Sequence, residues 1–422
     1  MKIWEAYMDK FELRDLTAED LPAYWKLACI AFHSKNAGLE DEKTFLENCA
    51  KEEQKARENP TARGNYRTRA GLFRDGKLLS TLTAHAFEVN FDGNICEFCG
   101  VGGVMSDPCA RKTGGVSRVM GRELEKMRQR GQLLSHLYPF QTSFYRRFGY
   151  EHCAYAMEWT IPTQFLPELP YNIRWYENTP EEQAAVRKIY EAFSAGHNLS
   201  LRRGGERWQG RFQRLQPYSG KSFSYLHYGD NGPDGFLSYR PKEHDDAPMT
   251  IEVEQLYYSG PQALRQLLAF LGSQRPYADE VKLRLPLGVD SSAWLTEVCT
   301  AYDKRDVRRE MVHLGASRVV DVEGVLKLAR YLGEGSADIR VVDPACPWND
   351  KCFHVEFGDR CRSVTETDRW DIRLTIGAFT AFILGARDLS EAAFLEGVEI
   401  GGNLENLRKI FYKKSIWLED HF

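Results

Sequence analysis

The sequence lacks the features that assign a chain to a membrane or to nucleic acid. No stretch of about 20 consecutive residues is apolar enough to span a bilayer, although 43% of the 422 residues are hydrophobic. The first residues turn charged at Asp9 and Lys10, so they do not resemble a secretion signal. The 56 Lys and Arg against 60 Asp and Glu form no block that could neutralise a run of phosphates. We therefore expect a cytoplasmic globular protein with neither a membrane nor a nucleic-acid partner.

The cysteines show no pattern of a disulfide or zinc framework. Ten of them stand at irregular positions, and Cys96 and Cys99 form a C-x-x-C pair. No second pair stands at zinc spacing, and both residues fall inside a strand-like run. We expect reduced thiols and no metal site.

Hydrophobic periodicity predicts a mixed first unit. Apolar residues recur at helical spacing over 17–32, and three strand-like runs follow, separated by the Asp-Gly turns at Asp75 and Asp92. The strand-like runs are residues 69–74, 78–89 and 95–106. An amphipathic helix then begins near Val116 and ends at Gly131, before a strand at 133–138 and a short segment at 143–150. This order predicts an α/β (α+β) layer with one central sheet.

Two further units are expected, which suits the length of the chain. The second begins near residue 162 and repeats the strand-and-helix order without the glycine motif described below. The third begins near residue 310. Its expected elements are a helix at 322–332, strands at 339–342 and 353–357, and an apolar run at 374–384.

The most informative stretch connects the third strand to the amphipathic helix. It contains Pro108, Arg111 and Gly114 in a P-x-x-R-x-x-G arrangement, followed by Gly115. Glycines permit a close backbone approach, and a helix N-terminus offers unpaired N–H groups, which suits a pyrophosphate. By itself the pattern is equally compatible with a simple strand-to-helix turn.

A second motif, about thirty residues further on, reads Ser-Phe-Tyr-Arg-Arg-Phe-Gly-Tyr from Ser143 to Tyr150. An aromatic core cluster is the alternative interpretation, and Phe148 and Tyr150 fit it. Tyr145 is the candidate for chemistry, because a phenol can donate a proton to a leaving group.

Together the two motifs resemble those of GNAT acetyltransferases. The first resembles V-x-x-[LV]-x-V-x-P-x-x-R-x-x-G, with Ser106 where an apolar residue is usual and Val116 where most members have Gly or Ala. An aliphatic residue at the second site is usual in the Eis branch. The resemblance implies acetyl-CoA as cosubstrate, with backbone pairing to pantetheine, a pyrophosphate loop and one further contact. The implied binding residues are Val104, Met105, Ser106, Arg111, Lys112, Thr113, Gly114, Gly115, Val116, Ser117, Phe140 and Gln141. A strand distortion near Val104 is implied as well, with an N–H for the thioester oxygen.

The same resemblance implies a catalytic pair. Tyr145 would face the sulfur as general acid, and the carboxylate of the last residue, Phe422, would be the general base that an ammonium acceptor requires. A frayed tail without a role is the alternative for any C-terminus. Glu419 and Asp420 either attract a cationic amine into the site or are solvated, and we expect solvation. His421 either orients the Phe422 carboxylate or is exposed, and we expect exposure. His85 and His136 are expected as core or surface histidines.

Along the whole chain the order of units resembles the Eis family. Residues 1–160 would be a GNAT domain with the acetyl-CoA site, 161–305 a degenerate GNAT-like domain, and 306–422 a sterol-carrier-protein-like α+β domain. The implied activity is N-acetylation of a primary amine, such as an aminoglycoside, a polyamine or a lysine, by a protein that assembles into hexamers. A non-catalytic protein that binds acyl-CoA or a lipid is the alternative. The sequence does not name the acceptor.

Overall fold

The computed structural model describes residues 11–32, 41–58, 67–217, 222–244, 247–299 and 305–422. The chain divides into two compact units. The first unit contains the chain up to Cys153, together with Gly315–Lys413 and Asp420–Phe422. The second contains Ala154–Leu314 and Lys414–Glu419. Each unit is described by itself.

A seven-stranded sheet in the order β1-β2-β3-β4-β5-β14-β6 organises the N-terminal part of the first unit. Its strands are β1 (Phe11–Asp15), β2 (Arg67–Arg74), β3 (Lys77–Phe91), β4 (Asn94–Ser106), β5 (Leu134–Leu137), β6 (Glu151–His152) and β14 (Ala316–Val319). β1 to β4 pair antiparallel in chain order, and β2–β3 and β3–β4 are tight hairpins because Asp75-Gly76 and Asp92-Gly93 adopt positive φ angles. β5 then pairs in parallel with β4 after a helical crossover.

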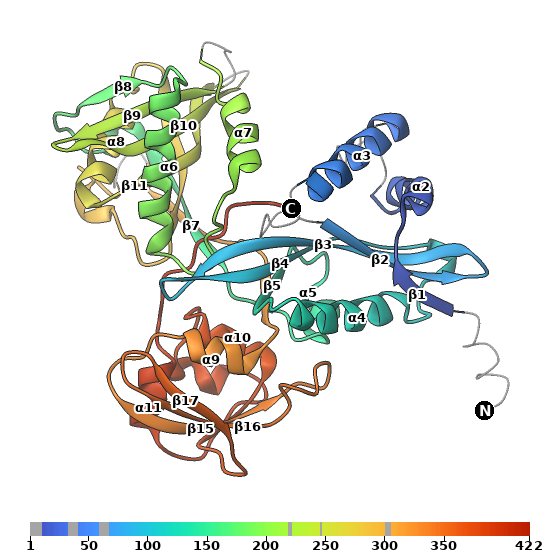
Figure 1. The fold of residues 1–422 in the computed structure, drawn as a ribbon. Coiled ribbons are helices and arrows are strands. Elements are labelled where there is room, and N and C mark those ends of the chain that lie inside the picture. The colour runs from blue at the N-terminus through green and yellow to red at the C-terminus, as the bar shows by residue number, and fades with distance from the viewer. Residues whose placement is uncertain (1–10, 33–40, 59–66, 218–221, 245–246, 300–304) are drawn as a thin grey trace, which may run out of the picture. The chain divides into compact units, whose positions relative to one another are not determined.

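Helices cover both faces of this sheet (Figure 1). α2 and α3 lie on one face, and α4 lies on the other. The helices are η1 (Ala18–Asp20), α2 (Leu21–Phe32), α3 (Glu42–Glu58), η2 (Pro108–Ala110), α4 (Gly115–Gln129) and α5 (Thr142–Arg146). α4 buries Val119, Met120, Leu124 and Met127, which are the apolar residues that recur at helical spacing in the sequence.

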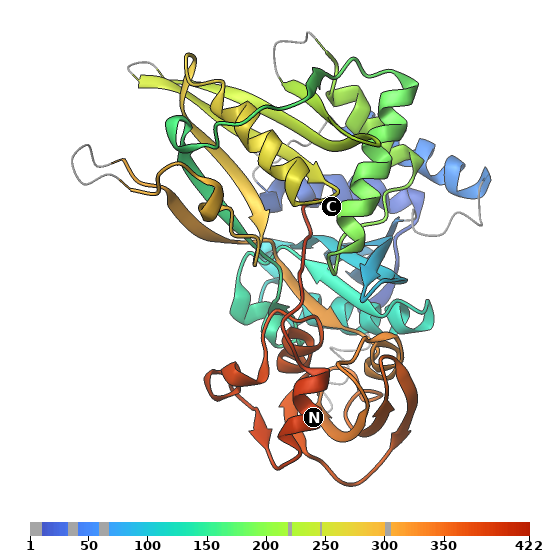
Figure 2. The ribbon, with the colours of Figure 1, turned by 90° about the vertical axis from the view of Figure 1, so that its left-hand side faces the viewer.

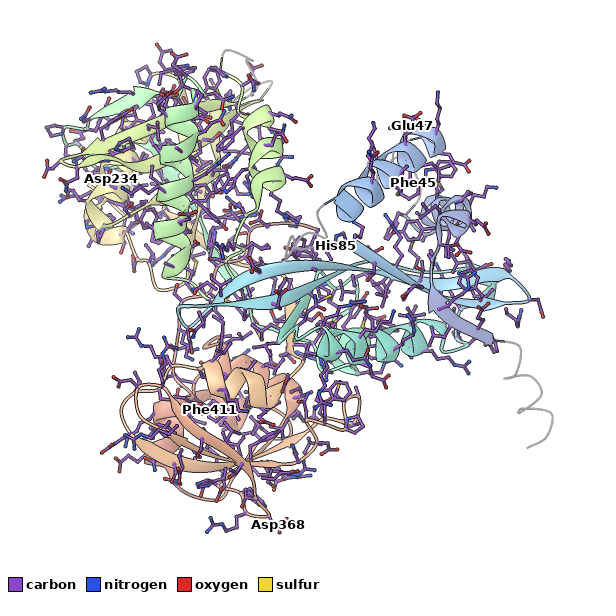
Figure 3. All side chains as sticks on the ribbon, in the orientation of Figure 1. Phe45, Glu47, His85, Asp234, Asp368 and Phe411 are labelled. Atoms are coloured by element: carbon purple, nitrogen blue, oxygen red, sulfur yellow. The ribbon has the colours of Figure 1, made fainter. Side chains whose placement is uncertain are left out.

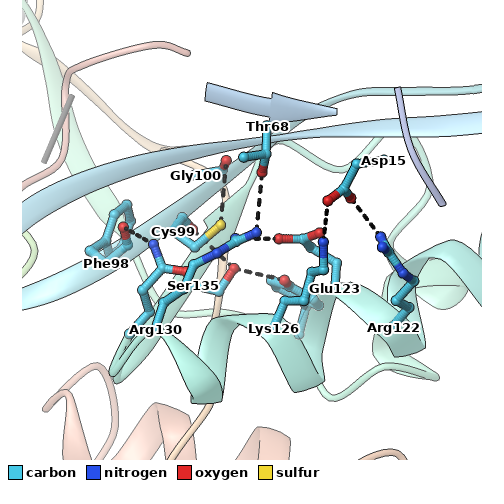
Figure 4. Close-up of polar contacts among 12 residues, drawn as sticks. Asp15, Thr68, Phe98, Cys99, Gly100, Arg122, Glu123, Lys126, Arg130 and Ser135 are labelled. Atoms are coloured by element: carbon cyan, nitrogen blue, oxygen red, sulfur yellow. Dashed lines mark hydrogen bonds and ion pairs between the residues drawn. The ribbon is translucent and has the colours of Figure 1, made fainter. Parts of the chain in front are cut away.

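Polar contacts also hold α4 to the sheet (Figure 4). Asp15 of β1 accepts hydrogen bonds from Arg122, at 2.7 Å, and from Lys126. Burial alone would raise the pKa of Asp15, but these two cations lower it below its usual value. On the buried side of the helix, Glu123 accepts a bond of 2.6 Å from Arg130. Charged and apolar contacts together fix α4 against the sheet, and this also fixes the position of its N-terminus.

The second unit has its own seven-stranded sheet, in the order β13-β7-β12-β11-β10-β9-β8. Its strands are β7 (Tyr155–Pro162), β8 (Ile173–Trp175), β9 (Phe223–Gly229), β10 (Gly232–His244), β11 (Ala247–Tyr258), β12 (Ala278–Pro286) and β13 (Arg308–His313). Its helices are η3 (Thr163–Phe165), α6 (Pro180–Ala195), α7 (Gly205–Arg214), α8 (Pro261–Gly272) and η4 (Ser292–Trp294). Figure 2 shows α8 across one face of this sheet, where its leucines enter the core.

The C-terminal part of the first unit is built on a five-stranded sheet in the order β17-β16-β15-β18-β19. Its strands are β15 (Gly335–Val342), β16 (Cys352–Phe357), β17 (Cys361–Glu366), β18 (Ile372–Thr375) and β19 (Glu399–Ile400). Its helices are α9 (Val322–Leu328), α10 (Ile376–Ile383), η5 (Leu389–Phe394) and α11 (Leu404–Ile410). α10 is buried along almost its entire length, which explains why the sequence shows an apolar run here without amphipathic spacing.

β14 joins this part to the first sheet. Its backbone pairs with β5 on one side and with β6 on the other. The fully buried Arg318 of β14 pairs with Asp343 at 2.5 Å and donates to the carbonyl oxygen of Phe148. The turn that follows α5 is therefore held by a side chain that comes from far along the sequence.

The predicted mixed α/β architecture is confirmed, and the structure builds it on three sheets. Several elements were not predicted, among them β1, α3, β17, β19 and α11. The helix expected at 322–332 ends already at Leu328, because Ala329 leaves the helical region with ψ 152°. No helix among the described residues is long and apolar enough to cross a membrane.

Candidate active site

β4 has an open edge near its end. The strand pairs in parallel with β5 from Phe98 to Val101, where β5 ends at Leu137. β4 itself continues to Ser106, so residues 102–106 extend beyond the end of β5 and have no partner strand on that side among the described residues. An exposed strand edge of this kind can pair with an extended ligand.

A β-bulge lies in this open part of β4. Thr81 of β3 faces Met105 and Thr83 faces Gly102, so Leu82 stands opposite the two residues Gly103 and Val104. Gly103 has φ 54°, and a Cβ there would lie 2.6 Å from the hydroxyl oxygen of Tyr24. Tyr24 in turn bonds to Thr83 at 3.0 Å. Gly103 is thus required both by the backbone conformation and by the close approach of Tyr24.

The loop from β4 to α4 adopts left-handed backbone angles at two positions. Lys112 has φ 66°, and Gly114, the N-cap of α4, has φ 77°. A Cβ on Gly115 would lie 2.3 Å from the Ser80 hydroxyl, so this glycine lets the helix start close to β3. The first N–H groups of α4 have no acceptor inside the helix, and they carry the positive end of its dipole.

A cavity of about 870 Å³ lies between the end of β4, the start of α4 and the segment after β5. Three cationic side chains line it, those of Arg111, Lys112 and Arg147, and no carboxylate among the described residues does. The remaining lining residues are Ala31, Phe32, Val104, Met105, Ser106, Ala110, Gly114, Gly115, Val116, Ser117, Phe140, Gln141 and Phe144. The positive lining and the helix N-terminus suit an anionic ligand, and the volume suits a large one.

Eleven of the twelve residues that the sequence suggested for cosubstrate binding line this cavity. The exception is Thr113, whose hydroxyl donates to the carbonyl oxygen of Ala110 at 2.8 Å and so closes the loop. Sequence reasoning did not include Ala31 and Phe32 of α2, Ala110 of η2, Phe144 of α5 or Arg147, which directly follows α5. The signal for the last two was available, because they lie inside the second motif.

Tyr145 lies on α5 and is only 3% exposed. It does not line the cavity, but its ring contacts the rings of Phe140 and Phe144, which do, at centroid distances of 5.5 and 5.1 Å. Burial raises the pKa of the Tyr145 hydroxyl to about 12. The phenol is therefore protonated at neutral pH and available as a proton donor.

The last residue of the chain is folded against the first sheet. The Phe422 ring packs among aromatic side chains of β3, β4, β5 and the residue after β5, at 5.3 Å from Phe87 and 5.5 Å from Tyr138. A Cβ on Gly100 would lie 2.5 Å from two atoms of this ring. A Cβ on Gly102 would lie 3.3 Å from the Phe422 carboxyl oxygen. The terminal carboxylate is therefore beside Gly102, while the cavity begins two residues further along the same strand.

The other polar residues of the tail differ from expectation in part. Asp420 is only 4% exposed, and Glu419 accepts hydrogen bonds from Arg203 and Tyr257 within the second unit. Solvation of these two acids was thus a wrong prediction, since the tail is packed and each acid is enclosed. His421 is exposed, as expected, with its ring 4.7 Å from that of Tyr138.

The two candidate histidines of the sheet have different surroundings. His136 is fully buried and bonds to the Ser317 hydroxyl at 2.8 Å. His85 is half-buried on β3, with its ring centroid 6.1 Å from that of Phe422. His136 fits the expected core histidine, whereas His85 lies beside the chain terminus.

Cys96 and Cys99 lie on β4 and are free thiols in the core. Burial raises the pKa of Cys96 to about 12 and also raises that of Cys99. Both are therefore unreactive thiols at neutral pH. In the part of the chain that the structure describes, no group of three or more His, Cys, Asp or Glu residues could hold a metal ion.

Comparison with known families assigns each of the three sheets. Residues 12–153 match the model of an acetyltransferase (GNAT) domain, and residues 199–314 match a second such model. Residues 322–419 match a sterol carrier protein domain. No curated protein matches the sequence.

Solved structures share the fold over nearly the whole chain. Eis1 from Mycobacterium abscessus is 20% identical, with a TM-score of 0.76 over 97% of this chain and 100% of that one. A GCN5-related N-acetyltransferase from Anabaena variabilis is 17% identical, with a TM-score of 0.78 over 98% and 100%. A probable N-acyltransferase from Enterococcus faecalis is 20% identical, with a TM-score of 0.77 over 98% and 100%.

The similarity to these solved structures shows a common fold. The family assignment rests on the two matched GNAT domains, and this family uses an acyl-CoA cosubstrate. The chain belongs to the GNAT N-acetyltransferase family, with two GNAT domains and a sterol carrier protein domain in an Eis-like architecture.

Proposed function

We propose that this protein transfers the acetyl group of acetyl-CoA directly to a primary amine, with Tyr145 as general acid and the Phe422 carboxylate as general base. The observation that carries the proposal is the position of the terminal carboxylate. It lies beside Gly102, at most about 7 Å along β4 from Val104, where the cationic cavity begins.

The cavity supports a CoA thioester as the acyl donor. Arg111, Lys112 and the N-terminus of α4 would hold the pyrophosphate. The open edge of β4 at Val104–Ser106 would pair with the amide groups of the pantetheine arm. This places the thioester near the bulge, where the N–H of Val104 can stabilise the oxyanion.

The reaction needs two proton transfers. The attacking amine forms the new C–N bond and gives a proton to a base, which we assign to the Phe422 carboxylate. The C–S bond breaks, and the leaving thiolate takes a proton from an acid, which we assign to Tyr145. Its raised pKa keeps the hydroxyl protonated for this step. Packing against Phe140 and Phe144 fixes its ring.

The proposed general base, a carboxylate, also indicates which class of amine acceptor the protein uses. A carboxylate beside the reacting centre attracts a cationic amine, such as a polyamine, an aminoglycoside or a lysine side chain. We further propose that the protein acts as a homo-oligomer, a hexamer by its resemblance to Eis proteins.

The test measures thiol release from acetyl-CoA in the presence of polyamines, aminoglycosides and lysine peptides. We expect release that depends on one of these acceptors. Tyr145→Phe and deletion of Phe422 should each lower turnover about 100-fold or more, which is a typical contribution of general acid or base catalysis. Acetyl-CoA affinity, measured by calorimetry, should change little.

Tyr412→Phe is the matched control, because Tyr412 bonds to the carbonyl of Arg330 in the sterol carrier protein domain. Its turnover should equal that of the wild type. Acetyl-CoA binding without acceptor-dependent release would instead favour a binding protein. Wild-type rates in both active-site variants would exclude the proposed acid and base.

A further inference from the structure

The Phe422 carboxylate and the His85 imidazole both lie close to Gly102. The point where a Cβ on Gly102 would stand is 3.3 Å from the Phe422 carboxyl oxygen and 3.4 Å from Nε2 of His85. His85 lies on β3, the neighbour of β4 (Figure 3). Because Gly102 has no side chain, nothing from this residue stands between the imidazole nitrogen and the carboxylate.

The other nitrogen of the ring has a donor beside it. Nε of Arg67 donates a hydrogen bond to Nδ1 of His85 over 3.3 Å. An arginine can only donate, so Nδ1 is the accepting nitrogen and the proton of the neutral imidazole is on Nε2. Nε2, the nitrogen that lies near the same point above Gly102 as the carboxylate oxygen, is therefore an N–H donor.

Aromatic neighbours fix the orientation of the ring. His85 stacks on Phe87 with an interplanar angle of 14° and a centroid distance of 6.0 Å. The Phe422 ring packs against His85 at 6.1 Å and against Phe87 at 5.3 Å. The imidazole and the terminal residue are thus packed in one aromatic cluster.

We propose that His85 is a positioning residue for the C-terminal base. Its Nε2–H stabilises the anionic form of the Phe422 carboxylate and directs the free oxygen toward the acceptor amine. A chain terminus has no following peptide bond to orient its carboxylate, so a fixed donor supplies that constraint. The inference rests on the proposed role of Phe422 in catalysis.

The experiment is a double-mutant cycle between His85→Phe and deletion of Phe422, with turnover measured at saturating acetyl-CoA. His85→Phe retains an aromatic ring but removes the donor. We expect it to lower turnover roughly 10- to 100-fold, as loss of a hydrogen bond to a charged group does, with the KM for acetyl-CoA unchanged. In the chain that lacks Phe422, the same substitution should cost nothing further, because the group it acts through is absent.

Two more variants sharpen the test. His85→Gln places an amide N–H near the position of Nε2 and should recover most of the turnover lost in His85→Phe. His354→Phe is the matched control: this histidine of β16 bonds to Asp338 at 2.6 Å, and its replacement should leave turnover unchanged.

The outcomes separate the two proposals. If deletion of Phe422 has no effect, the proposed base is wrong. If the deletion lowers turnover and His85→Phe lowers it further by its full factor, Phe422 keeps its role and the inference about His85 is overturned. Wild-type turnover in His85→Phe would overturn it as well.

Discussion

Gly100 offers the most direct test of the docked C-terminus. An alanine Cβ at this position would lie 2.5 Å from two carbon atoms of the Phe422 ring, and 2.8 Å from a third. Carbon atoms in van der Waals contact are about 3.5 to 4.0 Å apart, so the ring would have to move by about 1 Å or more. The carboxylate belongs to the same residue and would move with it.

The expected cost to activity follows from this displacement. A misplacement of about 1 Å at a reacting group can lower turnover about 100-fold. Stability should change far less. Gly100 pairs with His85 in regular β-structure, where Gly→Ala by itself stabilises a protein by about 0.4 to 1 kcal/mol and offsets part of the lost ring contacts. We therefore expect Gly100→Ala to be folded and nearly inactive in the thiol-release assay.

A suppressor and a control make the test specific. Phe422→Ala keeps a terminal carboxylate and removes the ring, so adding Gly100→Ala to it should cost little further activity. Gly121→Ala is the control, because a Cβ on this glycine of α4 meets no atom within 4 Å. Wild-type turnover in Gly100→Ala would refute the idea that the position of the Phe422 ring matters for catalysis.

Three other predictions concern titration and stability. Because the pKa of Tyr145 is raised to about 12, turnover at saturating substrates should not fall up to about pH 10 through ionisation of this group. A fall in turnover near pH 9 that is absent in Tyr145→Phe would contradict this prediction. Arg318→Met should lower the free energy of unfolding, measured in urea, by about 3 to 5 kcal/mol, because Asp343 would stay buried with Asn349 as its remaining partner. The double variant Arg318→Met/Asp343→Leu removes both charges and should recover much of that loss. Burial lowers the pKa of His197 to about 4, against about 6.5 in an unfolded chain, so the second unit should be fully stable above pH 6.5 and lose about 3 kcal/mol as the pH falls to 4. Calorimetric unfolding across this pH range checks the last prediction, and an equally steep loss in His197→Gln would contradict it.

The local elements of the fold could be predicted wherever one short-range signal dominated. The Asp-Gly turns at Asp75 and Asp92 have the positive φ angles that the sequence implied, and α4 begins at Gly115 and ends at Gln129, close to the bounds that its periodicity indicated. β1 was missed because it has only five residues and pairs at a sheet edge. α10 was seen only as an apolar run, since a helix buried on all sides has no polar face to reveal its period.

In the candidate site, too, only the residues with a local sequence signal could be predicted. The loop around Gly114 was evident, because glycine and helix-start signals are local and the motif is nearly contiguous. The positions of Tyr24 and His85 at the site could not be predicted, because each depends on a long-range approach: Tyr24 to the bulge at Gly103, and His85 to the last residue of the chain. The need for Gly100 and Gly102 likewise depends on Phe422, more than 300 residues away in the sequence. No local pattern encodes such a contact.

The first GNAT domain is also incomplete as a sequence segment. β6 pairs with β14, and β14 pairs in turn with β5, so the strand that joins β6 to the sheet comes from residues 316–319. Arg318 of that strand supports the turn after α5, and the final residue of the chain supplies the carboxylate beside Gly102. A fragment that ends near residue 160 would lose a strand within its sheet, the buried arginine below the second motif and the proposed base. β14 and the last residue both lie outside the matched segments 12–153, 199–314 and 322–419, and the candidate active site therefore depends on parts of the chain that no single matched domain contains.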